Sequence, residues 1–311
     1  MLSNKNILII KHGSIGDFVM AFSAIQSVRE KFPNEKIILI TTSLIARIFK
    51  KIPYINQICI DDRKSFLDIF NYLSILKKYQ INFIIDLQNS QRTEFYHLIT
   101  RCFFNDIKIN SSKKYAHFRY RIPRHGNEHV TEGLNNQLKL LNINKLNKLD
   151  ISWLVKKDFQ NKFEREYIVL IPGTSESGKK KRWPSKYFSK LSNYLIELGY
   201  EVLITGVSSD RYLIKEILNN SPSAINAEHM SKFDIFLNLS QNAGLIISVD
   251  TGPAHVAALS DTPMIWLVEE GPYSKTNSPV SKNLSIIKSK NMSLISVKEV
   301  LDLAKEKLDQ G

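Results

Sequence analysis

Short apolar runs alternate with helix-like segments over most of the chain. The first run, residues 7–10, has the length of a buried strand, and residues 18–32 then follow a period near 3.6 that indicates a helix. Repeated strand and helix patterns of this kind predict an open parallel α/β sheet with helices on both faces. In the first half the expected strands are 7–10, 36–41, 57–60, 82–85 and 107–109, and the expected helices are 18–32, 44–51, 65–79 and 90–104.

The alternation is interrupted once and then starts again. Residues 111–129 lose periodicity and collect cations, which indicates a basic surface loop, and a helix over 128–141 leads into a polar linker at 142–150. We therefore predict two Rossmann-like doubly wound domains, 1–150 and 151–311, that face a central cleft, with the last helix free to pack back on the first domain. In the second half the expected strands are 167–171, 201–205, 245–249, 264–268 and 285–288, and the expected helices are 185–198, 210–219, 232–242, 253–260 and 297–308.

The charge of the chain is strongly positive, with 43 Lys and Arg residues against 30 Asp and Glu and a formal net charge of +13. Nucleic acid, an anionic membrane surface or a phosphorylated substrate would suit this balance, and so would solvated lysines on helix faces. No apolar run approaches the roughly 20 residues that span a bilayer, and the N-terminus lacks the apolar stretch of a secretory signal. These features predict a cytoplasmic protein.

The turn after the first strand carries the first candidate for catalysis. Gly13 and Gly16 allow a tight turn with close backbone approach, and Asp17 follows at the expected start of the helix. Two glycines at this spacing are not the three-glycine fingerprint of dinucleotide-binding folds. The carboxylate of Asp17 either caps the helix or takes part in the chemistry, and these residues alone leave both interpretations open.

A stretch in the second half has the composition of a phosphate-binding loop. Residues 172–184 follow a buried strand and combine small and hydroxyl-bearing residues with four consecutive cations, 179–182. Thr174 and main-chain N–H groups would donate to a diphosphate, and Lys181 would balance its charge. A solvated basic turn is the alternative.

A second strand-to-helix turn offers further contacts to a nucleotide sugar. Asp250 is placed to accept hydrogen bonds from sugar hydroxyls, while Thr251 and Gly252 offer main-chain N–H groups to a phosphate. His255 lies one turn into the expected helix, where either a ligand contact or a buried core histidine fits the pattern. No grouping of His, Cys, Asp and Glu has the spacing of a metal site.

Four stretches stand in a characteristic order along the chain. They are residues 7–17 (ILIIKHGSIGD), 86–92 (DLQNSQR), 172–184 (from Pro-Gly-Thr to Lys-Arg-Trp-Pro) and 249–258 (VDTGPAHVAA). In sequence and spacing they resemble glycosyltransferase family 9, the heptosyltransferase family. The resemblance implies a GT-B fold and an inverting glycosyltransferase without a metal ion or other cofactor. It also implies transfer of heptose from ADP-heptose to a lipopolysaccharide core or a related surface glycan.

The resemblance also implies roles for the candidate residues. Asp17 would be the general base that takes a proton from the acceptor hydroxyl as that hydroxyl attacks the anomeric carbon. The leaving nucleoside diphosphate would be stabilised by positive charge and N–H donors, the part that a metal ion plays in other transferases. The residues implied to bind the donor are Thr174, Lys181, Asp250, Thr251, Gly252 and His255.

The first half would then bind the acceptor. Arg63, Lys64 and Arg92, with the basic loop 113–124, would suit a lipid-linked anionic glycan at the cytoplasmic face of the inner membrane, with peripheral contact to that surface. A solvated loop without a ligand is the alternative for 113–124.

Some residues depart from the family pattern and keep other functions open. Lys11-His12 and the stretches 227–231 and 267–273 differ from the family, which leaves the donor sugar and its nucleotide undecided. The alternative from another class is an NAD-dependent oxidoreductase; against it, the first turn has only two glycines and no clear acidic residue ends the second strand. A nucleic-acid-binding module has only the net charge in its favour, so no nucleic-acid partner is expected. The last alternative is a degenerate transferase kept for binding or assembly, and the presence of Asp17 argues against it.

Overall fold

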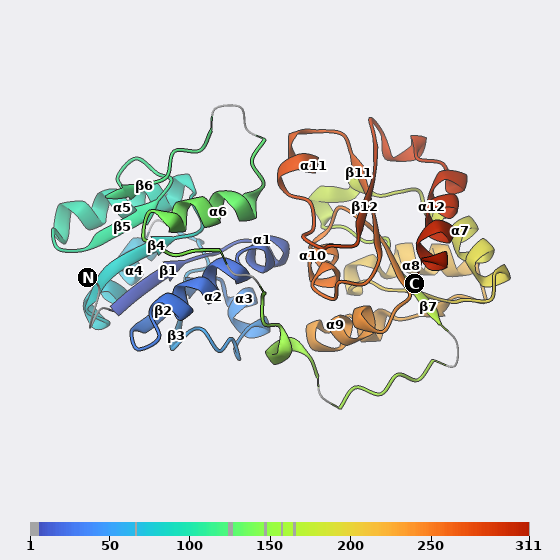
Figure 1. Cartoon of the computed structure of the whole chain (residues 1–311), viewed down its shortest axis with the longest axis horizontal. Coiled ribbons are helices and arrows are strands. Elements are labelled where there is room, and N and C mark those ends of the chain that lie inside the picture. The colour runs from blue at the N-terminus through green and yellow to red at the C-terminus, as the bar shows by residue number, and fades with distance from the viewer. Residues whose placement is uncertain are drawn as a thin grey trace. The chain divides into compact units, whose positions relative to one another are not determined.

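The structure is a computed structural model that describes residues 6–65, 67–123, 127–145, 148–156, 158–163 and 166–310. The chain divides into two compact units, Met1–Trp153 (unit 1) and Leu154–Gly311 (unit 2), and each unit holds one six-stranded sheet (Figure 1). The division falls after Trp153, beyond the expected boundary at residue 150, because the Trp153 ring packs against Phe22 of unit 1 with 5.6 Å between ring centroids.

Unit 1 is a parallel sheet in the order β3-β2-β1-β4-β5-β6, which is the strand order of a Rossmann fold. Its central strands are rich in Ile, and their apolar residues are buried, as expected for strands covered by helices on both faces. The strands are β1 (Asn6–Ile10), β2 (Lys36–Thr41), β3 (Gln57–Ile60), β4 (Ile81–Asp86), β5 (Lys108–Ser111) and β6 (Phe118–Arg119). The helices are α1 (Ile15–Met20), α2 (Phe22–Lys31), α3 (Ser43–Ile48), α4 (Asp68–Lys78), α5 (Gln91–Phe103) and α6 (Val130–Lys139).

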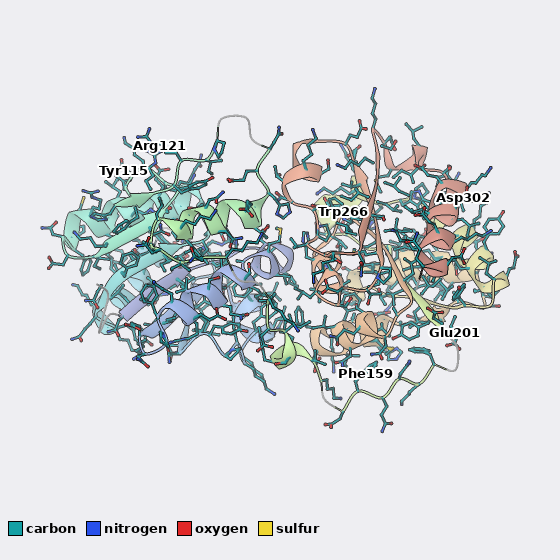
Figure 2. All side chains as sticks on the ribbon, in the orientation of Figure 1. Tyr115, Arg121, Phe159, Glu201, Trp266 and Asp302 are labelled. Carbon is teal, nitrogen blue, oxygen red and sulfur yellow. The ribbon has the colours of Figure 1, made fainter. Side chains whose placement is uncertain are left out.

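Unit 2 repeats the same arrangement, with the order β12-β11-β10-β7-β8-β9. Its core contains two buried tryptophans: Trp266, on β11 (Figure 2), and Trp183, whose ring N–H donates to Ile295 O at 2.9 Å. The strands are β7 (Tyr167–Ile171), β8 (Glu201–Ile204), β9 (Ile225–Asn226), β10 (Leu245–Val249), β11 (Met264–Glu269) and β12 (Leu284–Ser289). The α-helices are α7 (Ser185–Glu197), α8 (Arg211–Asn219), α9 (Phe233–Gln241), α10 (Gly252–Ala258), α11 (Pro272–Thr276) and α12 (Val297–Asp309). Short 3₁₀ helices are η1 (Ser152–Leu154), η2 (Glu176–Lys181), η3 (Ser208–Asp210), η4 (Glu228–Met230) and η5 (Met292–Leu294).

Each strand predicted from the sequence is present, and the differences lie in short elements. The predicted helix over 18–32 is two helices, α1 and α2, and the first of them begins at Ile15 because Ser14 caps it. The predicted loop over 111–129 contains β6, whose two residues pair with the end of β5. Strand β9 was also missed, since two residues carry no periodicity.

The last helix, α12, packs within unit 2. It lies against α7, and Val300 and Ala304 on its apolar face are fully buried in the core of that unit. The sequence leaves open whether this helix packs on the first domain. In the structure its apolar face is buried within unit 2.

In both sheets the direction in which successive strands are added reverses at the centre. In unit 1 this point lies between β1 and β4, where Ile10 pairs with Asp86, and in unit 2 it lies between β7 and β10, where Ile171 pairs with Ser248. Loops that follow the two central strands of a doubly wound sheet meet at this switch point, where such folds bind ligands. All four stretches singled out in the sequence leave these central strands.

Candidate functional site

The turn between β1 and α1 holds Asp17 in the first turn of a helix. Asp17 Oδ2 accepts hydrogen bonds from Ser14 N and from Ser14 Oγ, both at 3.1 Å, and Asp17 N donates to Ser14 Oγ at 3.3 Å. This capping box places the carboxylate at the positive end of the helix dipole. Asp17 is therefore a capping residue, and within the described part of the chain its second oxygen, Oδ1, accepts no hydrogen bond.

The two glycines of this turn have different surroundings. Gly13 has a φ of +48°, and a Cβ built on it would lie 2.9 Å from Asp17 Cβ, so both the conformation and the space require glycine. Gly16 lies inside α1 and is buried. Helix α1 begins at Ile15, three residues before Phe18, where the periodicity placed the helix start. Gly16 therefore belongs to the helix and not to the turn.

A buried histidine and carboxylate support the same turn. His12 is fully buried, with Nε2 2.9 Å from Asp61 Oδ2 at the end of β3, and Tyr96 Oη donates to the same oxygen at 2.8 Å. Burial, the largest influence, raises the pKa of Asp61, but the hydrogen bonds from His12 and Tyr96 outweigh it and lower the pKa below its ordinary value. This pair was not predicted, although each residue lies within two positions of the end of a strand.

Lys11 places a cation beneath the turn. Its side chain is buried, with Nζ donating to Leu87 O at 3.2 Å. Burial lowers the pKa of Lys11, while the nearby carboxylates of Asp17 and Asp86 act in the opposite direction. The carboxylate of Asp17 therefore lies close enough to Lys11 to offset part of the effect of burial on the lysine pKa.

The three predicted acceptor-binding residues differ in how far they are committed to other contacts. The Arg92 guanidinium binds Asp68 Oδ2 and Ser65 O, both at 2.9 Å, and its Nε donates to Tyr96 Oη at 2.7 Å. Lys64 is exposed, with Nζ 4.0 Å from Asp62, and Arg63 is exposed in a left-handed conformation with φ +58°. The structure thus gives Arg92 a role in holding β3, α4 and α5 together, and leaves Arg63 and Lys64 at the surface.

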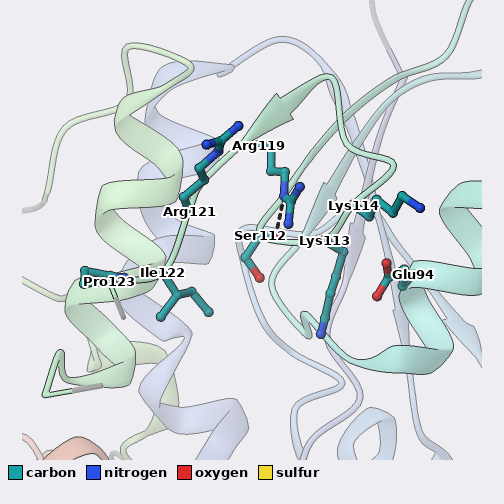
Figure 3. A pocket seen from close by; sticks show the side chains of 8 residues that line it. All are labelled: Glu94, Ser112, Lys113, Lys114, Arg119, Arg121, Ile122 and Pro123. Carbon is teal, nitrogen blue, oxygen red and sulfur yellow. Dashed lines mark hydrogen bonds between the residues drawn. The ribbon is translucent and has the colours of Figure 1, made fainter. Parts of the chain in front are cut away.

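The predicted basic loop forms one wall of an open groove in unit 1 (Figure 3). The groove has a volume of about 810 Å³. Arg119, on β6, donates from Nε to Ser112 O at 3.2 Å, which fixes its stem along the groove. Arg124 lies outside the described residues. The lining consists of Glu94, Ser112, Lys113, Lys114, Arg119, Arg121, Ile122 and Pro123, so four cations face one carboxylate.

In unit 2 the loop after β7 is held by a residue pair that the sequence analysis missed. Arg182 donates from Nε to Thr174 Oγ1 at 3.1 Å and from Nη2 to Asp210 Oδ1 at 3.2 Å. A Cβ on Gly173 would lie 2.3 Å from the Asp210 carboxylate, so the loop passes directly over that group. Thr174 is buried, and Arg182 fixes its hydroxyl oxygen. The signal for Asp210 was its place at the start of a helix after β8.

Lys181 and Asp250 come together although they are far apart in the sequence. Lys181 Nζ lies 2.6 Å from Asp250 Oδ2, and the two side chains are 48% and 22% exposed. The structure thus joins the cation of the first predicted donor-binding stretch to the carboxylate of the second. Exposed ion pairs contribute little to stability, so this one can exchange for a ligand at small cost.

The remaining predicted donor-binding residues lie at the start of α10. Thr251 is the extended N-cap residue, Gly252 begins the helix, and Pro253 follows in its first turn. His255 is buried, with 7% of its surface exposed. The N–H groups at this helix start therefore lie beside Asp250, at the end of β10.

Two searches of the described residues bear on other classes of function. No group of three or more His, Cys, Asp and Glu side chains in this part of the chain has the geometry to hold a metal ion. Among the same residues, no helix is both long enough and apolar enough to cross a membrane.

The fold and the four stretches define a class of protein, a glycosyltransferase built from two Rossmann-like units. The sequence profile of glycosyltransferase family 9 (heptosyltransferase) matches residues 71–305, and the chain belongs to this family. Family membership decides between the transferase and oxidoreductase interpretations in favour of the transferase.

Individual heptosyltransferases are similar in sequence to this chain over most of its length. Lipooligosaccharide heptosyltransferase 2 of Haemophilus ducreyi is 24% identical over 94% of this chain and 91% of its own length. Lipopolysaccharide heptosyltransferase 3 of Escherichia coli is 27% identical over 81% of this chain and 79% of its own.

Solved structures confirm the fold. The ADP-heptose lipopolysaccharide heptosyltransferase II of E. coli superposes with a TM-score of 0.76 at 19% identity, covering 98% of this chain and 99% of that one. A family 9 glycosyltransferase of Veillonella parvula gives a TM-score of 0.79 at 16% identity, covering 99% and 98%. The predicted GT-B fold is therefore confirmed.

Proposed function

We propose that this glycosyltransferase moves heptose from ADP-heptose to a lipopolysaccharide core or a related surface glycan, with inversion and without a metal ion. The observation that carries the proposal is Asp17, a carboxylate fixed at the switch point of unit 1 with one oxygen left for a substrate, in a chain of the heptosyltransferase family. The relatives named for lipooligosaccharide and lipopolysaccharide heptosyl transfer support this donor and this class of acceptor.

In this proposal Asp17 is the general base. Its Oδ1 accepts the proton of the acceptor hydroxyl while the hydroxyl oxygen forms a bond to the anomeric carbon and the bond to the diphosphate breaks. Attack from the face opposite the leaving group inverts the anomeric configuration. Ser14 keeps Oδ2 in place during this step, and Lys11 stabilises the carboxylate before it takes the proton.

The leaving diphosphate is bound by unit 2. Lys181 exchanges its partner Asp250 for a phosphate oxygen, and Asp250 becomes free to accept hydrogen bonds from the hydroxyls of the donor. Thr174 Oγ1 accepts from Arg182 and donates to Ser175 O at 3.2 Å, so its hydroxyl binds a phosphate oxygen by exchanging Ser175 O for it. The N–H groups of Thr251 and Gly252 offer further donors, with His255 supporting that turn. These positive and polar groups stabilise the charge that grows on the leaving group.

The acceptor is bound by unit 1. Four cations in the groove lined by Lys113 and Arg121 suit the phosphates of an anionic glycan, and Arg63 and Lys64 add exposed positive charge. A lipid-linked acceptor would bring the protein to the cytoplasmic face of the inner membrane, so we propose a cytoplasmic protein with peripheral contact there.

Calorimetric titration with ADP, UDP, GDP and NAD in the presence of EDTA tests the donor. We expect selective binding of ADP, followed by transfer of heptose from ADP-heptose to a core glycan that lacks it, with the anomeric configuration of the product inverted by NMR. Preferential binding of UDP or GDP would replace the donor, and a transfer that needs added metal would contradict the metal-independent mechanism.

A double variant tests the groove as the acceptor site. Lys113→Ala with Arg121→Ala removes two cations, and we expect the KM for a phosphorylated acceptor to rise roughly fivefold or more while the Kd for ADP is unchanged. Lys50→Ala with Lys77→Ala removes the same charge from exposed positions of unit 1 and serves as the control. An equal rise in KM for both double variants would show a general effect of charge and no site in the groove.

A further inference from the structure

The stretch 86–92 resembles the family, yet the proposed chemistry gives none of its residues a role. One of them, Gln88, contacts the turn that carries Asp17. Its amide oxygen Oε1 accepts hydrogen bonds from the main-chain N–H groups of His12 and Gly13, each at 3.0 Å. A single side-chain oxygen thus binds two consecutive N–H groups of the β1–α1 turn.

Gln88 is itself held in place by a buried carboxylate. Asp86 Oδ1 accepts hydrogen bonds from Gln88 N at 2.9 Å and from Asn89 N at 3.0 Å. Asp86 Oδ2 lies 3.2 Å from His97 Nε2 and accepts from Ser111 Oγ at 3.1 Å. Asp86 and His97 are both fully buried, and Asp86 pairs with Ile10 in the sheet. The position of Gln88 is therefore fixed relative to the end of β1.

The two N–H groups that Gln88 binds determine how the turn approaches Asp17. Gly13 has a left-handed conformation, and the position of its missing Cβ lies 2.9 Å from Asp17 Cβ. His12 is fully buried with Gln88 in place, so a side chain of similar size without an acceptor at position 88 would cover its N–H and leave it without a partner. Loss of the acceptor would leave adjacent N–H groups unsatisfied and release the conformation that packs Gly13 against Asp17.

We propose that Gln88 is a positioning residue for Asp17, acting through the main chain of His12 and Gly13. This inference rests on the proposed role of Asp17 as general base. A base must lie within hydrogen-bond reach of the proton it removes, and a displacement of about 1 Å is enough to cost a large factor in rate. Gln88 touches neither substrate in this proposal, so its loss affects kcat and leaves substrate binding unchanged.

The test compares Gln88→Leu, which has similar size and no acceptor, with Gln88→Glu, whose carboxylate accepts from both N–H groups. For Gln88→Leu we expect kcat to fall roughly ten- to hundredfold with both KM values within twofold of wild type. For Gln88→Glu, assayed on the alkaline plateau of the pH profile, we expect kcat within about fivefold of wild type. Gln91→Leu, an exposed glutamine of the same stretch, is the matched control and is expected to keep the wild-type kcat.

Hydrogen exchange separates this inference from the proposed function. The amides of His12 and Gly13 should be protected in wild type and exchange faster in Gln88→Leu, a result that needs no substrate. If wild type transfers no sugar, the proposed function fails and the exchange rates still decide whether Gln88 holds the turn. Unchanged exchange in Gln88→Leu, a kcat within twofold of wild type, or a Gln88→Glu variant no better than Gln88→Leu would each overturn the inference.

Discussion

The two units differ in how far the ionisable side chains beside the loop after their first strand are buried. In unit 1 a histidine and a carboxylate beside the β1–α1 turn are buried and paired, with His12 and Asp61 0% and 3% exposed. In unit 2 the pair beside the β7–η2 loop, Lys181 and Asp250, is 48% and 22% exposed. The side chains beside the first turn are thus fixed by buried contacts, whereas those beside the second stay accessible to solvent.

The difference follows from the residues available to each turn. A neutral or charged imidazole can be buried when a carboxylate receives its N–H, as Asp61 does for His12. Four consecutive cations cannot all be buried, and of the four only Arg182 is largely covered, with its side chain 20% exposed beside Asp210. Lys179 pairs with Glu176 at the surface, and Lys181 with Asp250.

The largest expected effect is that of a substitution beside the β1–α1 turn. Asp17→Asn keeps the size of the side chain and an oxygen that can cap α1, but an amide cannot take the proton of the acceptor. We expect kcat to fall roughly 10²- to 10⁴-fold, while the Kd for ADP stays within a few-fold of wild type. Single-turnover assays and calorimetry measure the two quantities.

Asp106→Asn is the control for this variant, since it removes an exposed carboxylate from the same unit. A near wild-type kcat in Asp17→Asn would exclude the general-base role and leave Asp17 as a helix cap alone.

A substitution in the basic loop of unit 2 should weaken ligand binding and leave the stability of the fold unchanged. Lys181→Ala removes an exposed partner of Asp250, so we expect the Kd for ADP to rise about tenfold, which corresponds to about 1.4 kcal/mol, with no loss of thermal stability. Calorimetry gives the Kd, and thermal unfolding gives the stability. Lys180→Ala, the exposed neighbouring lysine, is the control. Equal affinities for Lys181→Ala and wild type would show that this basic loop is only a surface turn.

The sequence predicted the longer strands, most of the helices and the four stretches because these features are local. Buried parallel strands are continuous apolar runs, and glycine and proline mark the turns that follow them. The Rossmann order then brings the ends of β1 and β4, and those of β7 and β10, to the two switch points. Asp17, Thr174 and Lys181 could be proposed from the sequence because each lies in a stretch that follows a central strand.

The supporting contacts could not be predicted, since they depend on pairings across the sheet. Asp61 reaches His12 from the next-but-one strand, and Gln88 binds the main chain of residues 76 and 75 positions earlier. Arg92 carried a charge that suggested an anionic ligand, whereas the structure commits it to Asp68 and Tyr96. A sequence gives the charge of a side chain, but only the fold shows whether another side chain already uses it.

The smallest expected effect is a difference in sign between two buried carboxylates. In unit 1 the hydrogen bonds from His12 and Tyr96 outweigh burial and lower the pKa of Asp61. In unit 2 burial, the largest influence, raises the pKa of Asp210, although Val207 N–H and Arg182 oppose it. The ordinary value for both is 3.8. A lowered pKa gives stability that is present above the ordinary value and is lost as the pH falls, and a raised pKa gives the reverse.

The variants Asp61→Asn and Asp210→Asn measure this difference. The quantity is the free energy of unfolding of wild type minus that of the variant, obtained by urea denaturation at pH 7 and at pH 3.5. For Asp61→Asn it should decrease on acidification, because wild type loses the contribution of the ionised carboxylate below 3.8. For Asp210→Asn it should increase, because protonation relieves the cost of a buried charge as the pH falls through its raised pKa. If both differences moved in the same direction, the contrast between the two turns would not extend to their carboxylates. An increase in both would mean that burial governs both pKa values, and a decrease in both would mean that hydrogen bonds do.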